Sequence, residues 1–328
     1  MFNMNQVLPM IRMNPWYPGQ MGVPGSDVPR GLLSAPNRKV FFVDRGHPNA
    51  SATADGTNPE EPLTSIQIAV DHPLLSHGDV IVVGPSTLNS TYAGISAYNQ
   101  RENVVVANTR PAFVHLIGAG SSPFQIVWDA LDTSLPNLSL KAPGWTVQGF
   151  KFHSPATSAA IKLFDSSPVA LDQCQYTSIL GNYFDGAWGG KYGVELTGAP
   201  GNVVIKDNWF LEHKQGGGDA YAIRETSSGN ANSYECILEG NIFMENDNHV
   251  KVGYGASIIR GNTFQVGGLI PATLKLDLSG GTVGHNVVID NVLMGTYSIA
   301  GGYLGNIAHP DSWAGNFNLA GFTLIPPV

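Results

Sequence analysis

Five short segments of this chain repeat one four-residue phrase: a small or acidic residue, an asparagine, any residue and an apolar residue. An aliphatic residue stands three positions before each asparagine. A repeated phrase of this kind indicates that the chain passes through equivalent structural units, one for each copy. The asparagines are Asn182, Asn208, Asn241, Asn262 and Asn291.

The spacing of the copies varies, although the phrase does not. Successive asparagines are 26, 33, 21 and 29 residues apart, from the differences between their sequence numbers. This is typical of a solenoid whose loops differ in length. The segments are rich in β-branched and aromatic residues between glycines and asparagines, which indicates strands. Apolar runs at 203–205 and 287–289 are typical of strands buried in parallel sheets. The sequence therefore predicts an all-β fold, a single-stranded right-handed parallel β-helix.

In this interpretation the asparagine occupies a turn, because asparagine tolerates the left-handed backbone region. Its side-chain amide would bond the equivalent amide of the next coil, about 4.8 Å away. The aliphatic residue before it and the apolar residue after it would point into the core. The alternative is a β-sandwich in which the asparagine-containing turns coincide by chance.

Composition narrows the class of protein. Charged residues make up 13% of the chain, about half the roughly 25% of ordinary soluble domains, and 39 of its 328 residues are glycine. This favours an extracellular or particle-bound β protein. The net charge is −8 and there is no long basic run, so we expect no nucleic-acid partner. No apolar stretch is long enough to span a membrane, and the first dozen residues carry no secretory pattern.

Cysteine and metal-ligand patterns are sparse. Cys174 lies eight residues before Asn182, whereas Cys236 lies five before Asn241, so the two would not stack. We expect free thiols in the core. No metal-ligand spacing occurs, and we predict neither a metal nor a cofactor.

Residues 1–38 differ from the rest of the chain. Interleaved prolines and glycines exclude a continuous helix or a central strand. The segment also carries Met13, Trp16, Tyr17 and Met21, which is unusually apolar for a free linker. The sequence predicts an extended attachment arm that orders against a partner, with a disordered tail as the alternative. The β-helix would span 39–310, and 311–328 would form a tail or cap.

A short helix is expected just after the first strand. Thr64 is an N-cap candidate, with Gln67 three residues later to complete a capping box. Ile66, Ala69 and Val70 give the helix one apolar face. Such a helix would cover the open end of the solenoid, where strand edges are otherwise unpaired.

The same region carries a resemblance to a known group of proteins. The chain resembles the right-handed β-helix proteins of the pectin-lyase-like superfamily over roughly residues 39–310. Members include polysaccharide lyases, glycoside hydrolases, phage tail spikes and non-enzymatic virion proteins, so the resemblance implies a fold and not a function. It rests on the segments 40–44, 55–57, 62–64, 78–83 and 116–120, with Pro59, Ile66 and Ala69.

The catalytic phrases of these enzymes are missing. The sequence lacks the Arg-x-Pro-x-x-Arg pattern of the lyases and the Asn-Thr-Asp, Asp-Asp, Gly-His-Gly and Arg-Ile-Lys phrases of the polygalacturonase-type hydrolases. One candidate catalytic pair follows from the positions of two glutamates within the repeat. Glu212 and Glu245 each lie four residues after an asparagine, so they would stack about 4.8 Å apart, close to the roughly 5–5.5 Å of a retaining glycosidase.

Further ionisable residues of these two repeats would line a groove beside the pair, and Gly216–Gly218 would let a loop bend over it. The alternative is that residues entering surface loops simply carry charge. The residues are His213, Asp219, Arg224, Glu225, Asp247 and His249.

Three aromatic residues are candidates for stacking on sugars: Trp188, Tyr192 and Trp209. Trp209 stands between the asparagine and the core phenylalanine, so it would point outward. The alternative is an aromatic residue packed under a loop.

Since proteins of this fold act outside cells, a chain without an export signal is expected to travel on a particle. We expect a non-enzymatic virion protein, a capsid decoration (cement) or short fibre subunit. Residues 1–38 would hold it to a major capsid or tail protein, and the resemblance implies a homotrimer. The alternatives are a polysaccharide-degrading tail spike or glycosidase, and a non-catalytic β-helix that binds a host-surface glycan.

Overall fold

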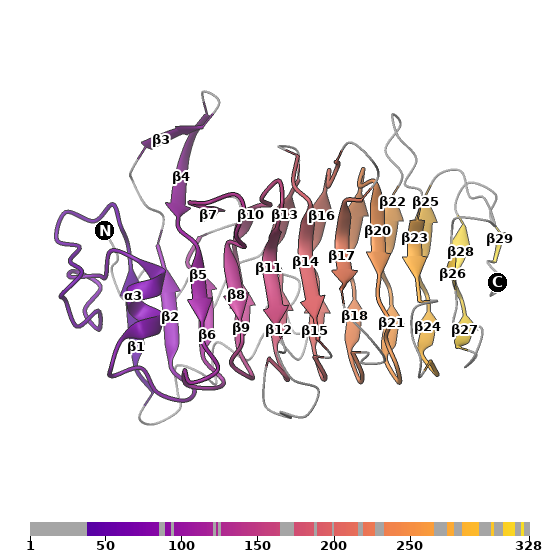
Figure 1. The fold of residues 1–328 in the computed structure, drawn as a ribbon, viewed down its shortest axis with the longest axis horizontal. Helices are drawn as coiled ribbons and strands as arrows, with labels where there is room; N and C mark the ends of the chain where they lie inside the picture. Colours follow the sequence, from indigo (N-terminus) through magenta and orange to yellow (C-terminus); the bar gives the residue numbers. More distant parts are fainter. Residues whose placement is uncertain are drawn as a thin grey trace.

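The computed structural model of the chain describes part of its residues, and the predicted arm with Met13, Trp16, Tyr17 and Met21 lies outside them, as does Trp188. The described residues form a rod of stacked coils (Figure 1). Each complete coil adds one strand to each of three sheets, which we call sheets 1, 2 and 3. The described residues are 38–84, 89–92, 95–120, 123, 126–164, 174–186, 189–198, 200–215, 219–226, 233–265, 274–278, 284–294, 303–304, 311–318 and 323–324.

Sheet 1 begins each coil. Its strands, in spatial order, are β1 (Val40–Val43), β2 (Val80–Val83), β6 (His115–Gly118), β9 (Thr146–Gln148), β12 (Ser178–Leu180), β15 (Val204–Lys206), β18 (Ile237–Glu239), β21 (Ile258–Arg260), β24 (Val287–Ile289) and β27 (Ser312–Ala314).

Sheet 2 follows the asparagine turn. Its strands are β3 (Asn89–Tyr92), β4 (Ile95–Arg101), β7 (Val127–Asp129), β10 (Lys151–His153), β13 (Tyr183–Asp185), β16 (Trp209–Leu211), β19 (Ile242–Met244), β22 (Thr263–Gln265), β25 (Val292–Met294), β28 (Phe317–Asn318) and β29 (Thr323–Leu324).

Sheet 3 closes each coil. Its strands are β5 (Val104–Val106), β8 (Leu138–Leu140), β11 (Ala159–Phe164), β14 (Tyr192–Thr197), β17 (Tyr221–Glu225), β20 (Asn248–Lys251), β23 (Leu274–Asp277) and β26 (Tyr303–Leu304).

Parallel pairing runs through all three sheets. Within the described residues, antiparallel pairing is confined to β3 with β4 and β28 with β29. The β-sandwich alternative requires antiparallel sheets and is therefore wrong. The prediction of an all-β right-handed parallel β-helix is confirmed. Beyond residue 310, β27 and β28 continue sheets 1 and 2, and β29 turns back on β28 (Figure 1).

The predicted asparagine ladder is present. Asn208 donates from its backbone N–H and its Nδ2 to Asn241 Oδ1, both at 3.0 Å, and from Nδ2 to the carbonyl of Ile179 at 2.9 Å. The pattern repeats from Asn182 to Asn291, and Asn316 extends it. Each rung thus ties three neighbouring coils through buried hydrogen bonds.

The explanation for the asparagine was wrong in one respect. The left-handed conformation belongs to the residue before it: Gly181, Asp207, Gly240 and Asp290 have φ values of 56°, 55°, 64° and 55°. Glycine and aspartate occur there because they adopt this region most readily. The asparagine is selected for its amide, which both donates and accepts along the ladder.

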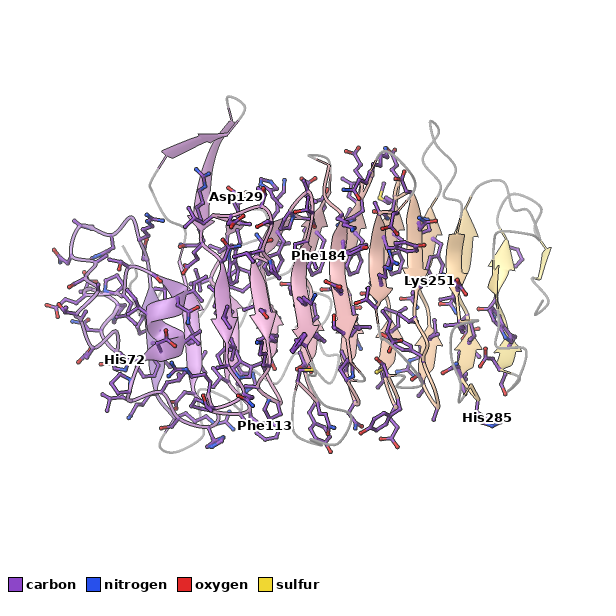
Figure 2. The ribbon with its side chains drawn as sticks, in the orientation of Figure 1. His72, Phe113, Asp129, Phe184, Lys251 and His285 are labelled. Atoms are coloured by element: carbon purple, nitrogen blue, oxygen red, sulfur yellow. The ribbon has the colours of Figure 1, made fainter. Side chains whose placement is uncertain are left out.

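The core follows the predicted phase. The aliphatic residues of the phrase, from Ile179 to Val288, and the phenylalanines Phe184, Phe210 and Phe243 are fully buried. Phe184 lies within the body of the solenoid (Figure 2). Its ring stacks on that of Phe210 with centroids 4.6 Å apart, and Phe210 stacks on Phe243 at 5.1 Å. Cys174 and Cys236 are free and buried, as predicted.

The capping helix α3 (Ile66–Asp71) packs its apolar residues into the core at the end of the rod, but its N-cap differs from the prediction. Ser65 accepts the backbone N–H of Ile68, so Thr64 is not the cap. The carboxylate of Glu102, from the loop before β5, accepts N–H groups of the first turn at 2.9 and 3.1 Å. No helix of the described chain is both long and apolar enough to cross a membrane.

Candidate functional site

The outer face of sheet 2 gathers aromatic and ionisable side chains in the middle coils. We define this face by eight residues. They come from the neighbouring strands β10, β13 and β16 and from the corners that follow β16 and β19: Lys151, His153, Tyr183, Asp185, Trp209, Glu212, Lys214 and Glu245.

Its aromatic part is formed by Tyr183 and Trp209, which are register partners in β13 and β16. Their ring centroids are 6.2 Å apart. Trp209 is 47% exposed, so its side chain points outward, as the phase predicted. Tyr183 is partly buried; burial, together with the charges of Asp185 and Glu212, raises the pKa of its hydroxyl to about 12. The phenol is therefore neutral and able to donate a hydrogen bond.

Its ionic part is organised in pairs. Lys151 Nζ lies 2.8 Å from Asp185 Oδ2 and also sits over the ring of Tyr183, 5.5 Å from its centroid. His153 Nδ1 pairs with Asp129 of β7. Lys214 Nζ lies 3.7 Å from Glu245 Oε2. These pairs cross from coil to coil, and they fix the side chains around the aromatic residues.

The two predicted catalytic glutamates occupy equivalent positions. Leu211 and Met244 are register partners, and Glu212 and Glu245 follow them directly, each at positive φ (56° and 52°). The backbone N–H of Glu212 donates to the carbonyl of Met244 at 3.0 Å. Adjacent parallel strands are about 4.8 Å apart, so the expected stacking of these two positions is present in the backbone.

The other residues of the predicted groove do not gather beside them. Arg224 lies on β17 of sheet 3 and Asp219 lies just before that strand; Arg224 pairs with Asp219 and donates to the hydroxyl of Tyr192 at 2.8 Å. Tyr192 is 5% exposed, beside Tyr221 and beneath Lys191 and Arg224. The prediction of a single groove lined by all of these residues is therefore wrong, because a corner of the coil separates sheet 2 from sheet 3.

His213 and His249, placed in the same groove by the sequence, are fully buried instead. Glu225 is also buried and accepts hydrogen bonds from the backbone and hydroxyl of Ser233, both at 2.8 Å. Asp247 accepts the backbone N–H of Gln215. The chain turns inward after the corner position, which the spacing of the repeat does not reveal. Among the described residues, no three His, Cys, Asp or Glu side chains are arranged to hold a metal ion.

His213 joins a buried polar cluster. Its Nδ1 lies 2.8 Å from Asn246 Oδ1, and its Nε2 lies 2.9 Å from Ser154 Oγ. Asn246 Oδ1 also accepts the backbone N–H of His213, and its Nδ2 donates to the carbonyl of Phe210, so the amide orientation places the proton on Nδ1. Gly186 packs against the backbone of His213: a Cβ at Gly186 would come within 2.6 Å of the Cα of His213.

This serine–histidine–asparagine arrangement resembles a nucleophilic relay, but its surroundings argue against chemistry. All three residues are at most 5% exposed. Burial lowers the pKa of His213 to about 4, which makes it a weak base at neutral pH. The cluster instead ties together the corner between sheets 2 and 3.

A consequence of the buried imidazole is acid sensitivity. The unfolded chain protonates His213 near its ordinary pKa of about 6.5, whereas the folded chain does so near 4. The contribution of His213 is therefore fully present above about pH 6.5 and falls as the pH drops toward 4, by up to about 3 kcal/mol. We expect urea unfolding between pH 7.5 and 4.5 to show a steeper loss in the native chain than in His213→Gln, where the lowered pKa of His115 still contributes its own loss. Parallel pH profiles for the two would contradict it.

Five residues of the outer face of sheet 2 were missed from the sequence: Lys151, His153, Tyr183, Asp185 and Lys214. A signal existed for Tyr183, which stands between Asn182 and Phe184 as Trp209 stands between Asn208 and Phe210. Asp185 directly follows that phenylalanine, at the position of Leu211. Lys151 lies in a coil without the asparagine, so the phrase does not mark it.

A comparison with protein-family models finds no match for this chain, and neither does a comparison with curated proteins. Solved structures with the same architecture do match. Escherichia coli YbhC is 10% identical, with 87% of this chain and 86% of that one covered and a TM-score of 0.52. The alginate lyase from Paenibacillus sp. str. FPU-7 is 13% identical, covering 77% and 92%, with a TM-score of 0.48.

The pectate lyase Pel9A is also similar, at 10% identity over 87% of this chain and 78% of that one, with a TM-score of 0.43. Identities this low bear on the fold alone. The fold, a right-handed parallel β-helix, is established by the pairing within the three sheets, and the structure of YbhC is similar to it.

Proposed function

We propose that this chain is a non-enzymatic β-helix of a virion that binds a surface glycan on the outer face of sheet 2. The observation that carries the glycan-binding part is the exposed Trp209 beside Tyr183, with Lys151 over the Tyr183 ring and paired with Asp185. Aromatic faces stack on the apolar faces of sugar rings, while the surrounding polar groups bond the hydroxyls. The rigid stack of coils holds these groups in place before a ligand arrives.

Two features support a binding role without catalysis. The carboxylates Asp185 and Glu245 are held in ion pairs by Lys151 and Lys214, which favours fixed geometry over proton transfer. The sequence also lacks the catalytic phrases of the lyases and hydrolases that it resembles.

We expect Trp209→Ala to weaken glycan binding by about tenfold or more, because a stacked aromatic contributes roughly 1.4 kcal/mol of binding free energy. A glycan microarray identifies an oligosaccharide that the wild-type chain binds, and calorimetry then measures its affinity for each variant. Tyr176→Ala is the matched control, because Tyr176 is 55% exposed but precedes β12 at the corner between sheets 3 and 1. Equal loss in both variants would refute the site.

A second candidate, a glycosidase, is favoured by one observation: the equivalent positions of Glu212 and Glu245 in adjacent coils. A retaining enzyme needs two carboxyl groups about 5–5.5 Å apart. Incubation of the bound oligosaccharide with the chain separates the two functions. Shortened products that disappear in Glu245→Gln would support the enzyme, and an intact oligosaccharide supports the binding protein.

Attachment to the particle is the other part of the proposal. Residues 1–38 would hold the chain to a capsid or tail protein, and a homotrimer would strengthen weak single contacts by avidity. Its support is the apolar, Pro- and Gly-rich sequence of this segment. We expect deletion of residues 1–38 to abolish co-sedimentation with particles that lack the protein, while circular dichroism of the β-helix stays unchanged. Undiminished co-sedimentation would contradict attachment through this segment.

A further inference from the structure

The lysines on the outer face of sheet 2 are already engaged. Lys151 is bound by Asp185 at 2.8 Å and lies over Tyr183, and Lys214 is bound by Glu245 at 3.7 Å. An acidic sugar would have to displace one of these carboxylates to reach a cation. The face therefore offers a ligand no unpaired positive charge among its described residues.

Glu212 differs from the other carboxylates of this face. Within the described residues it forms no ion pair with a lysine, arginine or histidine, and it is only partly buried. It follows β16 by one residue, next to the strand that carries Trp209. It stands three residues after Trp209, and its charge contributes to the raised pKa of the Tyr183 hydroxyl. A ligand at the aromatic residues thus meets a carboxylate without a counter-ion.

We propose that this face selects glycans that carry a protonated amine, such as amino sugars, over neutral glycans and over uronic acid polymers. This inference rests on the proposed glycan-binding function of the same face. An ammonium group can donate a charge-assisted hydrogen bond to the carboxylate of Glu212. It is also attracted to the electron-rich face of the exposed Trp209. A uronate would be repelled by Glu212.

The chain offers a matched control for Glu212. Glu235 is a second glutamate in the left-handed region, with φ of 52° against 56° for Glu212, and it is exposed. It precedes β18, at the corner between sheets 3 and 1 and away from the aromatic pair. Glu212→Gln and Glu235→Gln remove the same charge from the same backbone conformation, so their difference isolates the site from the net charge of −8.

The test is calorimetry at pH 5.5 with three hexamers: fully deacetylated chitosan, fully acetylated chitin and oligogalacturonate. We expect the full-length chain to bind the chitosan hexamer about tenfold more tightly than the chitin hexamer, and oligogalacturonate most weakly. Glu212→Gln should remove that preference by weakening the binding of the chitosan hexamer about tenfold. Glu235→Gln should behave as the wild type.

The outcomes separate this inference from the function on which it rests. Equal affinities for chitosan and chitin, tighter binding of oligogalacturonate, or equal effects of the two glutamine variants would overturn amine selection. In each of these cases, a glycan affinity that falls in Trp209→Ala would still support the proposed glycan-binding function. Absence of binding to all three hexamers and to a glycan microarray would overturn both.

Discussion

Replacing Asn241 by alanine is expected to lower the free energy of unfolding by about 3–5 kcal/mol. The buried amide accepts the backbone N–H and the Nδ2 of Asn208, both at 3.0 Å, and donates to the carbonyl of Ile205 at 2.9 Å and to Asn262 Oδ1 at 3.0 Å. Alanine leaves these partners buried without a bond, at about 1–3 kcal/mol for each group that stays unsatisfied. Urea unfolding followed by circular dichroism measures the loss.

The matched control is Asn58→Ala in the exposed loop before α3, where the side chain only accepts the backbone N–H of Glu60. It should cost less than about 1 kcal/mol. A similar small loss for Asn241→Ala would mean that water or a shifted backbone replaces the ladder bonds, and the ladder would then not be a main source of stability.

The ladder could be predicted from the sequence because its chemistry demands one residue type at one position. An amide can donate two hydrogen bonds and accept two at once, whereas a hydroxyl can donate only one, so Asn182, Asn208 and Asn241 recur whatever the loop length between them. The same requirement made the parallel stacking predictable. The Gly or Asp before each asparagine was visible in the phrase, but the left-handed conformation was assigned to the asparagine instead of to that residue.

A second column of left-handed residues gave no sequence signal. Phe113, Tyr176, Glu235 and His285 all have φ between 52° and 62° and each lies two residues before a strand of sheet 1. Phe113 and His285 lie along the same edge of the rod (Figure 2). Backbone N–H groups of this column, such as that of Tyr176, bond carbonyls of the next coil. Since side chains do not take part in these bonds, many residue types are accepted.

The candidate site was predictable in part for a related reason. The number of residues that separates each side chain from its asparagine predicted that Trp209 is exposed and that Glu212 and Glu245 occupy equivalent positions in adjacent coils. The ion pair between Lys151 and Asp185 joins different coils, and the variable loops hide which residues become neighbours. The chain can turn inward at His213 because Gly186, in the preceding coil, has no side chain to occupy that space.

Replacing Phe210 by alanine is the second change with a large expected effect. Its ring is stacked between those of Phe184 and Phe243, with interplanar angles of 4° and 7°. Removing a fully buried phenylalanine costs about 3–5 kcal/mol, and the upper part of that range applies where the surroundings cannot collapse. Here the asparagine ladder and the parallel strands fix the spacing of the coils, so the cavity should remain.

Phe210→Leu is the matched variant, because leucine keeps much of the apolar volume and should cost about 1–2 kcal/mol. Solenoid coils interact mainly with their neighbours, so the cavity should also weaken the stack locally. Hydrogen exchange should therefore accelerate most in β13, β16 and β19 and little in β1 and β2. If alanine costs no more than leucine, or if exchange rises equally along the rod, the aromatic stack is not what holds the middle coils together.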